Sequence, residues 1–197
     1  MEDVSTIKQT KITDKNFVAK YIDSDGKVCY RANLFDQVGP IENYVPLIHA
    51  LNSAKEGERV TININSPGGY VTTGLRIMQA MFNCKANVET YGVGPCASIA
   101  ACIWAAGKTR ILSEPLGSLM VHMPSSQVGG KTLDIAEECK FTNEFFAGLI
   151  RQLFCSVLTT EELDKVINER TDSYFPAAVI NQRIAANNDK ALDGGIK

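Results

Sequence analysis

The sequence lacks the long apolar segments that would commit it to a membrane. Its apolar stretches fall short of the roughly 18–20 residues that a membrane-spanning helix needs. Residues 1–17 are polar and carry no apolar core, so we expect no secretory signal there. A net charge of −2 gives no reason to expect nucleic acid or a membrane surface as a partner. These absences favour a soluble globular protein.

Histidine is scarce, and cysteine pairs at metal-binding spacing are missing. The chain has two histidines and six cysteines, and no two cysteines form a CxxC pair. Without a short-spaced Cys/His group we expect no metal site, and no other cofactor is indicated. Most of the cysteines lie in apolar stretches, which is typical of buried thiols in a reducing compartment, so we expect a cytoplasmic protein. The cysteines are Cys29, Cys84, Cys96, Cys102, Cys139 and Cys155.

The apolar pattern predicts strands that alternate with helices. Stretches 16–23 and 27–35 alternate around Ser24-Asp25-Gly26, which indicates a hairpin. Further strands are expected at 59–64, 88–93, 110–112 and 118–121, and helices at 41–51, 71–82 and 99–106. A Gly94-Pro95 turn is expected directly after the strand at 88–93. This order predicts an α/β fold with a largely parallel sheet.

A chain of 197 residues suits one domain with appended segments. We expect a flexible N-terminal arm at residues 1–15, a folded domain at 16–187 and a flexible tail at 188–197. From Thr132 to about Leu158 an apolar stripe continues without proline, which predicts an unusually long helix that crosses the domain or projects from it. Two more helices are expected at 160–169 and 176–186, the second opened by Pro176.

Ser98 lies where a predicted strand meets a predicted helix of small residues. The stretch reads Gly92-Val93-Gly94-Pro95-Cys96-Ala97-Ser98-Ile99-Ala100-Ala101-Cys102. Backbone N–H groups are unpaired at a helix start, so a nucleophilic hydroxyl at this position would have oxyanion donors beside it. Taken in isolation, the position favours the alternative that Ser98 only caps the helix, because serine is common at helix starts. The G-x-S-x-G elbow of the α/β-hydrolases is absent.

A hydroxyl nucleophile needs a base and a group that orients the base. His122 follows an apolar strand, where its ring would reach the sheet edge; a hydrogen-bonded structural histidine is the alternative. Asp172 lies at a helix-to-loop junction and is a candidate orienting carboxylate, or else a plain turn aspartate. His49 is expected to be a surface or packing histidine rather than a catalytic one.

Two glycines at another strand end offer a second set of donors. In Asn65-Ser66-Pro67-Gly68-Gly69 the glycines have no Cβ, so their backbone N–H groups can approach a ligand closely. An ordinary β-turn is the alternative. The glycine patterns that bind dinucleotides and nucleotide phosphates are not satisfied here.

Four motifs together resemble the Clp protease proteolytic subunit family (ClpP). They are Asn65-Ser66-Pro67-Gly68-Gly69, Gly94-Pro95-Cys96-Ala97-Ser98-Ile99, Met120-Val121-His122-Met123-Pro124 and Thr171-Asp172-Ser173-Tyr174-Phe175, in the family's order and spacing. The resemblance covers about Arg31 to Ala178. It implies a crotonase-like α/β spiral of ββα units with a long projecting handle helix, at about residues 125–158.

The resemblance also implies a site and an assembly. Ser98 would be the nucleophile of a serine endopeptidase, His122 its base and then acid, and Asp172 the residue that holds the imidazole. The oxyanion hole would be formed by the N–H groups of Gly69 and Ile99. The implied substrate-binding positions are Gly68, Gln127, Val128 and Gly129, where an extended peptide would add as a strand. The implied partners are peptides or unfolded proteins and further copies of the chain, in one heptameric ring or two rings stacked as a tetradecamer.

Some positions depart from the family's pattern. The strand face through which members dock an unfoldase by apolar residues carries Thr61, Asn63 and Asn83 here. Arg170 and Thr171 stand where the family usually has an acidic residue and then the arginine that couples two rings. We therefore expect a divergent member, of a kind that a phage could encode. A Clp-type AAA+ unfoldase is left open as a partner.

The leading hypothesis is a serine endopeptidase that cuts peptides inside an oligomeric chamber. The alternative is a structural ring subunit of a Clp-type complex with misaligned catalytic residues. A third hypothesis, a crotonase-like acyl-CoA enzyme, has less support because that chemistry does not usually need a Ser/His pair.

Overall fold

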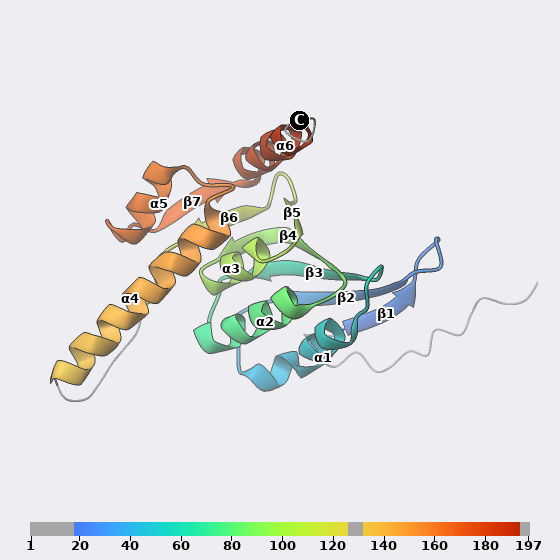
Figure 1. Ribbon diagram of the computed structural model, residues 1–197, viewed down its shortest axis with the longest axis horizontal. Helices are drawn as coiled ribbons and strands as arrows, with labels where there is room; N and C mark the ends of the chain where they lie inside the picture. Colours follow the sequence, from blue (N-terminus) through green and yellow to red (C-terminus); the bar gives the residue numbers. More distant parts are fainter. Residues whose placement is uncertain (1–17, 126–131, 194–197) are drawn as a thin grey trace, which may run out of the picture.

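The computed structural model describes residues 18–125 and 132–193, and its seven strands form one sheet (Figure 1). The strand order is β1-β2-β3-β4-β6-β7, and β5 pairs with β4 beside this path. The strands are β1 (Val18–Ile22), β2 (Val28–Phe35), β3 (Arg59–Ser66), β4 (Asn87–Ala97), β5 (Thr109–Leu112), β6 (Ser118–Val121) and β7 (Ser173–Pro176). The helices are η1 (Ile41–Tyr44), α1 (Val45–Ser53), α2 (Val71–Asn83), α3 (Ile99–Ala105), α4 (Thr132–Phe154), α5 (Thr160–Ile167) and α6 (Ala177–Asp193).

The predicted hairpin is confirmed, and its turn is stabilised by a side chain. Strands β1 and β2 pair antiparallel, with Ile22 opposite Val28. The Asp23 carboxylate accepts the backbone N–H groups of Asp25 and Lys27 at 3.0 and 2.9 Å. These hydrogen bonds to the ionised form lower the pKa of Asp23.

The centre of the sheet is parallel, as the alternation of strands and helices predicted. Strands β2, β3, β4, β5 and β6 are joined by parallel pairings. On one face of β3, Val60, Ile62 and Ile64 are fully buried, and helices α1, α2 and α3 cover this side of the sheet (Figure 1). Because parallel strands end at the same edge, the residues after β3 and β4 meet at one side of the sheet. The α/β fold is therefore confirmed.

The chain beyond Val93 differs from the prediction. Strand β4 continues through Gly94 and Pro95 to Ala97 instead of turning after Val93. The pairing with β3 shifts between Ile64 and Ser66, and the end of β4 pairs with β6 from Pro95 to Ala97. Gly and Pro are tolerated in a strand at such irregularities, so the local turn signal was misleading.

The carboxyl-terminal part also contains features that the pattern did not reveal. Strand β7 was not predicted; it pairs antiparallel with β6, so both ends of the sheet are antiparallel. Helix α6 continues to Asp193, beyond the predicted end at 186. Helix α5 ends at Ile167, two residues before the predicted end, and α4 ends at Phe154 rather than near 158. Helix boundaries depend on tertiary contacts that a periodic pattern does not encode.

Helix α4 has the long projecting form that was expected. Its last turns are anchored by the buried residues Phe146, Ile150, Leu153 and Phe154, while its first turns extend away from the sheet (Figure 1). The predicted arm at 1–15 and the substrate positions Gln127, Val128 and Gly129 lie outside the described residues, as does the part of the predicted 188–197 tail beyond Asp193. Residues 188–193 of that tail belong to α6. Within the described ranges, no helix combines the length and the apolar character needed to cross a membrane.

Candidate active site

Ser98 lies between strand β4 and helix α3 in a conformation that few non-glycine residues adopt. Its φ is 56° and its ψ is −129°, and its N–H donates to the Met120 carbonyl at 2.9 Å. The side chain makes no capping hydrogen bond to α3. The alternative that Ser98 serves as a hydroxyl cap is therefore wrong. Strained backbone of this kind is typical of functional sites, because it holds a side chain away from its ordinary partners.

The Ser98 hydroxyl instead contacts the imidazole of His122. The Oγ–Nε2 distance is 2.7 Å, which fits an O–H donating to a neutral imidazole nitrogen. His122 directly follows β6, and β6 pairs with the end of β4 next to Ser98. The sheet itself therefore sets the Ser98–His122 contact.

The second nitrogen of His122 faces Asp172. Nδ1 lies 3.5 Å from the Asp172 Oδ1, within the range of an ion pair but long for a hydrogen bond. The cause of this proximity is the pairing of β6 with β7, in which Val121 lies opposite Ser173. His122 and Asp172 flank this pair. The Asp172 side chain is 56% exposed and the His122 side chain 23%, so water screens the contact.

The glycines after β3 form an additional short strand pairing. Val38 donates its N–H to the Gly68 carbonyl at 2.7 Å, and its carbonyl accepts the Tyr70 N–H at 2.8 Å. Gly69 stands opposite Val38 in this parallel bridge. In such a pairing the N–H and C=O of the middle residue point to the other edge. The Gly69 N–H is thus directed away from Val38.

Only glycine fits at positions 68 and 69, because neighbouring atoms leave no room for a Cβ and because both φ angles are positive. Gly68 has a φ of 94° and Gly69 a φ of 146°. A Cβ on Gly68 would lie 2.7 Å from the Ser98 Cβ, and one on Gly69 would lie 2.3 Å from the Val38 carbonyl oxygen. The two donor-bearing segments, 68–69 and 98–99, are therefore packed directly against each other.

Ile99, the residue after Ser98, is the second expected donor. It is the first residue of α3, so its N–H has no partner within the helix. Its side chain is buried against α2, where a Cβ on Gly74 would lie 2.1 Å from the Ile99 Cγ1. Gly74 thus permits the close approach of α2 and α3, a role that the sequence analysis missed.

The thiols around Ser98 do not compete with its hydroxyl. Cys96 and Cys102 flank Ser98 along the chain, and both are buried. Burial raises the pKa of each thiol to about 12, because the thiolate would lose its hydration. Both remain neutral and unreactive near pH 7.

His49 and Gly68 were also considered for the site, together with side chains that could bind a metal. His49 is on the exposed side of α1, away from the Ser98–His122 contact. Gly68 adjoins Ser98, but its N–H already donates to the Ser66 Oγ at 3.1 Å. In the part of the chain that the structure describes, no group of His, Cys, Asp or Glu side chains is suited to hold a metal ion.

The sequence analysis missed the residues that hold the site through their backbone. The backbone of Val38 forms hydrogen bonds with Gly68 and Tyr70, and the Met120 carbonyl accepts the Ser98 N–H. No side-chain signal marks such residues, because any residue type offers these groups. Ser66 was more accessible to prediction, since a serine two residues before a glycine often accepts its N–H in a turn.

Comparisons of the sequence with known proteins find matches to one family. The sequence model of the family described as Clp protease matches residues 15–175. The chain is 35% identical over 132 residues to "ATP-dependent Clp protease proteolytic subunit 1" of Corynebacterium jeikeium, covering 64% of this chain and 68% of that protein. It is 31% identical over 123 residues to the subunit 1 protein of Chlamydia felis, covering 60% and 58%.

A chloroplast protein shares a shorter stretch. "ATP-dependent Clp protease proteolytic subunit 3, chloroplastic" of Arabidopsis thaliana is 40% identical over 88 residues, or 44% of this chain and 28% of that protein. The aligned stretch thus spans two thirds of the Corynebacterium protein and less than two thirds of the other two.

Proposed function

Because the chain belongs to the Clp protease family, we propose that it is a serine peptidase whose nucleophile is Ser98. The observation that carries the proposal is the 2.7 Å contact between the Ser98 Oγ and the His122 Nε2. This contact supports the proposal because acyl transfer needs a nucleophilic hydroxyl within hydrogen-bond reach of a base. The proposed substrates are peptides and unfolded polypeptides.

In the proposed acylation step, the Ser98 Oγ attacks the carbonyl carbon of the scissile peptide bond. His122 takes the hydroxyl proton on Nε2 as the new C–O bond forms. It then gives this proton to the leaving amine as the C–N bond breaks. Asp172 faces Nδ1 at 3.5 Å, where it keeps that nitrogen protonated and stabilises the imidazolium.

The acyl-enzyme is then hydrolysed by the same groups. A water molecule gives a proton to the His122 Nε2 and attacks the ester carbon, and the proton returns to Ser98 as the ester bond breaks. In both steps, negative charge forms on the former carbonyl oxygen. The N–H groups of Gly69 and Ile99 are proposed to receive it, and each such donor typically contributes about 3–4 kcal/mol.

We further propose that the chain acts as a homo-oligomeric ring, a heptamer alone or stacked as a tetradecamer. The exposed part of α4 supports this view. Phe141 is 70% exposed and stacks on Phe145, with ring centroids 6.2 Å apart. Exposed aromatic side chains on a projecting helix are typical of a surface that another chain covers. Native mass spectrometry tests the stoichiometry.

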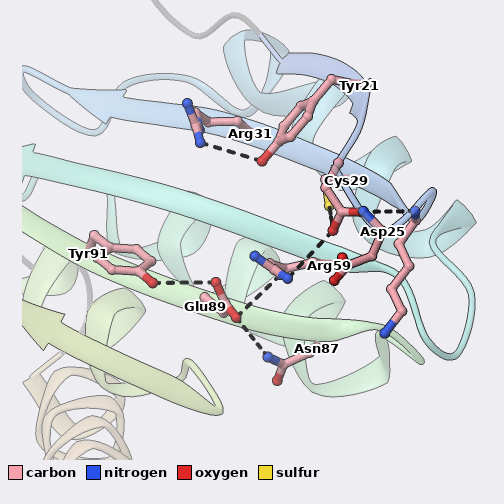
Figure 2. Close-up of polar contacts among 10 residues, drawn as sticks. Tyr21, Asp25, Cys29, Arg31, Arg59, Asn87, Glu89 and Tyr91 are labelled. Atoms are coloured by element: carbon pink, nitrogen blue, oxygen red, sulfur yellow. Dashed lines mark hydrogen bonds and ion pairs between the residues drawn. The ribbon is translucent and has the colours of Figure 1, made fainter.

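The outer face of the sheet carries a cluster of charged and polar side chains around Arg59. Arg59 lies between Asp23 and Glu89, with nitrogen–oxygen distances of 3.7 and 3.6 Å, and Figure 2 shows it beside Glu89. Tyr91 and Asn87 also donate to Glu89. Farther along the strands, the amide of Asn63 donates to that of Asn33 at 2.9 Å. This part of the face presents polar groups, whereas Val93 and Ile111 are exposed apolar side chains farther along β4 and β5, so the proposal leaves a Clp-type AAA+ unfoldase open as a partner. A cytoplasmic location stays part of the proposal.

Cleavage of fluorogenic peptides by the wild type and by Ser98→Ala tests the proposed activity. We expect turnover by the wild type and none by Ser98→Ala at equal oligomeric mass. Equal turnover by both proteins would contradict the role of Ser98. A wild type that assembles but cleaves nothing would instead support the alternative of a structural ring subunit.

A further inference from the structure

The hydroxyl of Ser66 is a buried polar group to which the acyl-transfer steps assign no role. Ser66 is 1% exposed and is the last residue of β3. It lies opposite Cys96 of β4, so its backbone is held by the sheet. Its Oγ accepts the N–H of Gly68 at 3.1 Å. The next residue, Gly69, bears the N–H assigned to the oxyanion hole.

The direction of the Gly69 N–H follows from the peptide unit that it shares with the Gly68 carbonyl. In a planar trans peptide these two groups point in opposite directions. The Gly68 carbonyl accepts the Val38 N–H at 2.7 Å. The Gly69 N–H is therefore aimed away from Val38 only while this peptide plane keeps its orientation.

Glycine is a poor residue for holding such a plane on its own. Gly68 has a φ of 94°, and without a Cβ it can populate several backbone conformations of similar energy. The orientation is fixed because both peptide units that adjoin Gly68 are held. Val38 holds the unit after Gly68, and the Ser66 hydroxyl holds the unit before it.

We propose that Ser66 is a positioning residue of the oxyanion hole. Its hydroxyl fixes the peptide unit before Gly68, and through Gly68 it fixes the direction of the Gly69 N–H toward the reacting carbonyl. The inference rests on the proposed peptidase function. It adds that a hydroxyl with no contact to the substrate controls the stabilisation of the transition state.

Loss of the Ser66 hydroxyl is expected to lower kcat rather than to raise KM. The oxyanion exists only in the transition state and the tetrahedral intermediate, so a misdirected donor weakens them more than it weakens the bound substrate. Small misplacements of such groups cost up to about 100-fold in rate. We expect Ser66→Ala to lower kcat about 10- to 100-fold and to change KM less than about twofold.

A peptide boronic acid gives a second readout. Its tetrahedral adduct with a serine places an anionic oxygen in the oxyanion hole, so its affinity reports the hole rather than substrate binding. Ser66→Ala should weaken this inhibitor by about the same factor as kcat. Ser66→Cys keeps a weak acceptor at the same position, and its kcat should lie between those of the wild type and Ser66→Ala.

Thr90→Val is the matched control. The Thr90 hydroxyl is equally buried and donates to the Trp104 carbonyl at 2.7 Å, but Thr90 does not adjoin Ser98, Gly68 or Gly69. Its loss should lower the melting temperature and leave kcat unchanged. If Ser66→Ala does not fold, Ser66→Cys carries the same comparison.

The possible results separate the two proposals. A lower kcat and weaker boronate binding for the Ser66 variants, with Thr90→Val unaffected, support the inference. Wild-type kcat in a folded Ser66 variant overturns it, as does an equal loss of kcat in Thr90→Val. A wild type that neither cleaves peptides nor binds the boronate overturns the proposed peptidase function, and the Ser66 inference with it.

Discussion

Gly68 packs so closely on Ser98 that an added Cβ would stand 2.7 Å from the Ser98 Cβ and 3.2 Å from its Oγ. Real Cβ atoms essentially never show contacts under 3.0 Å. The segment that bears one proposed oxyanion donor thus lies directly against the proposed nucleophile, and the same segment is paired with Val38. Backbone packing and backbone pairing therefore set the geometry of the site.

Gly68→Ala should therefore slow peptide cleavage strongly. The new methyl group must displace Ser98 or the 68–70 segment, and a shift of this kind costs about 100-fold or more in kcat/KM. The positive φ of 94° adds strain, typically about 1–3 kcal/mol. Steady-state kinetics together with thermal unfolding measure the two effects.

Gly57→Ala is the control for backbone strain alone. Gly57 also has a positive φ, 83°, but an added Cβ would meet no atom within 4 Å. It should lose about 1–2 kcal/mol of stability and retain kcat/KM. Equal activity of Gly68→Ala and the wild type would contradict the close packing at Ser98.

Asp172→Asn should slow cleavage less severely than His122→Ala. The Asp172 carboxylate is 56% exposed and 3.5 Å from the His122 Nδ1, so water weakens its hold on the ring. In other triads the equivalent change costs about 10,000-fold; here we expect about 100- to 1,000-fold. Asp25→Asn, at an exposed turn, should match the wild type. If Asp172→Asn has the same kcat as the wild type, Asp172 has no catalytic role.

Alkylation of the folded protein by iodoacetamide should distinguish the cysteines. Cys155 is exposed and should react, whereas the buried Cys96 and Cys102 should not. Burial raises the pKa of these two thiols to about 12, so almost no thiolate is present near pH 7. Peptide mapping by mass spectrometry locates the adducts. Alkylation of Cys96 or Cys102 at the rate of Cys155 would contradict the burial of these two thiols.

Glu162→Gln should destabilise the carboxyl-terminal part of the domain. The Glu162 carboxylate accepts two hydrogen bonds from Arg183, at 2.7 and 3.0 Å, and one from the Thr159 N–H at 2.9 Å. The variant should lose about 1–3 kcal/mol of unfolding free energy at pH 7. Urea unfolding measures this loss. The exposed neighbour Glu161→Gln should stay within about 0.5 kcal/mol of the wild type.

The Glu162–Arg183 pair also predicts how the stability difference between the wild type and Glu162→Gln depends on pH. Hydrogen bonds from Arg183 are the main cause that lowers the pKa of Glu162 below its usual 4.5. A lowered folded-state pKa gives stability that is fully present above about pH 4.5 and is lost as the pH falls through the lower, folded value. The gap between the wild type and Glu162→Gln should therefore narrow below about pH 4.5. A gap that widens there would contradict the Arg183 pairing.

The sequence predicted most of the fold because the local pattern and the tertiary structure agree there. The β1–β2 hairpin and the parallel strands β2, β3 and β4 carry clear period-two patterns, and α2 and α4 carry clear helical stripes. Strand β7 has four residues and owes its form to pairing with β6. Such a strand has no pattern long enough to detect.

The candidate site was partly predictable for the same reason. Motifs identified Ser98, His122 and Asp172, and the structure brings their side chains together. Local reasoning alone favoured a helix cap at Ser98, because serine is common at helix starts. Only the pairing of β4 with β6 places His122 beside Ser98, and that contact directs the hydroxyl away from α3.

Labelling by a fluorophosphonate probe tests the central claim most directly, since the probe forms a covalent bond only with an activated serine. We predict one adduct per chain on the wild type, mapped to Ser98, and no adduct on Ser98→Ala. His122→Ala should label far more slowly, because the base is missing. A wild type that stays unlabelled, or a Ser98→Ala variant that labels as the wild type does, would contradict the claim that Ser98 is the nucleophile.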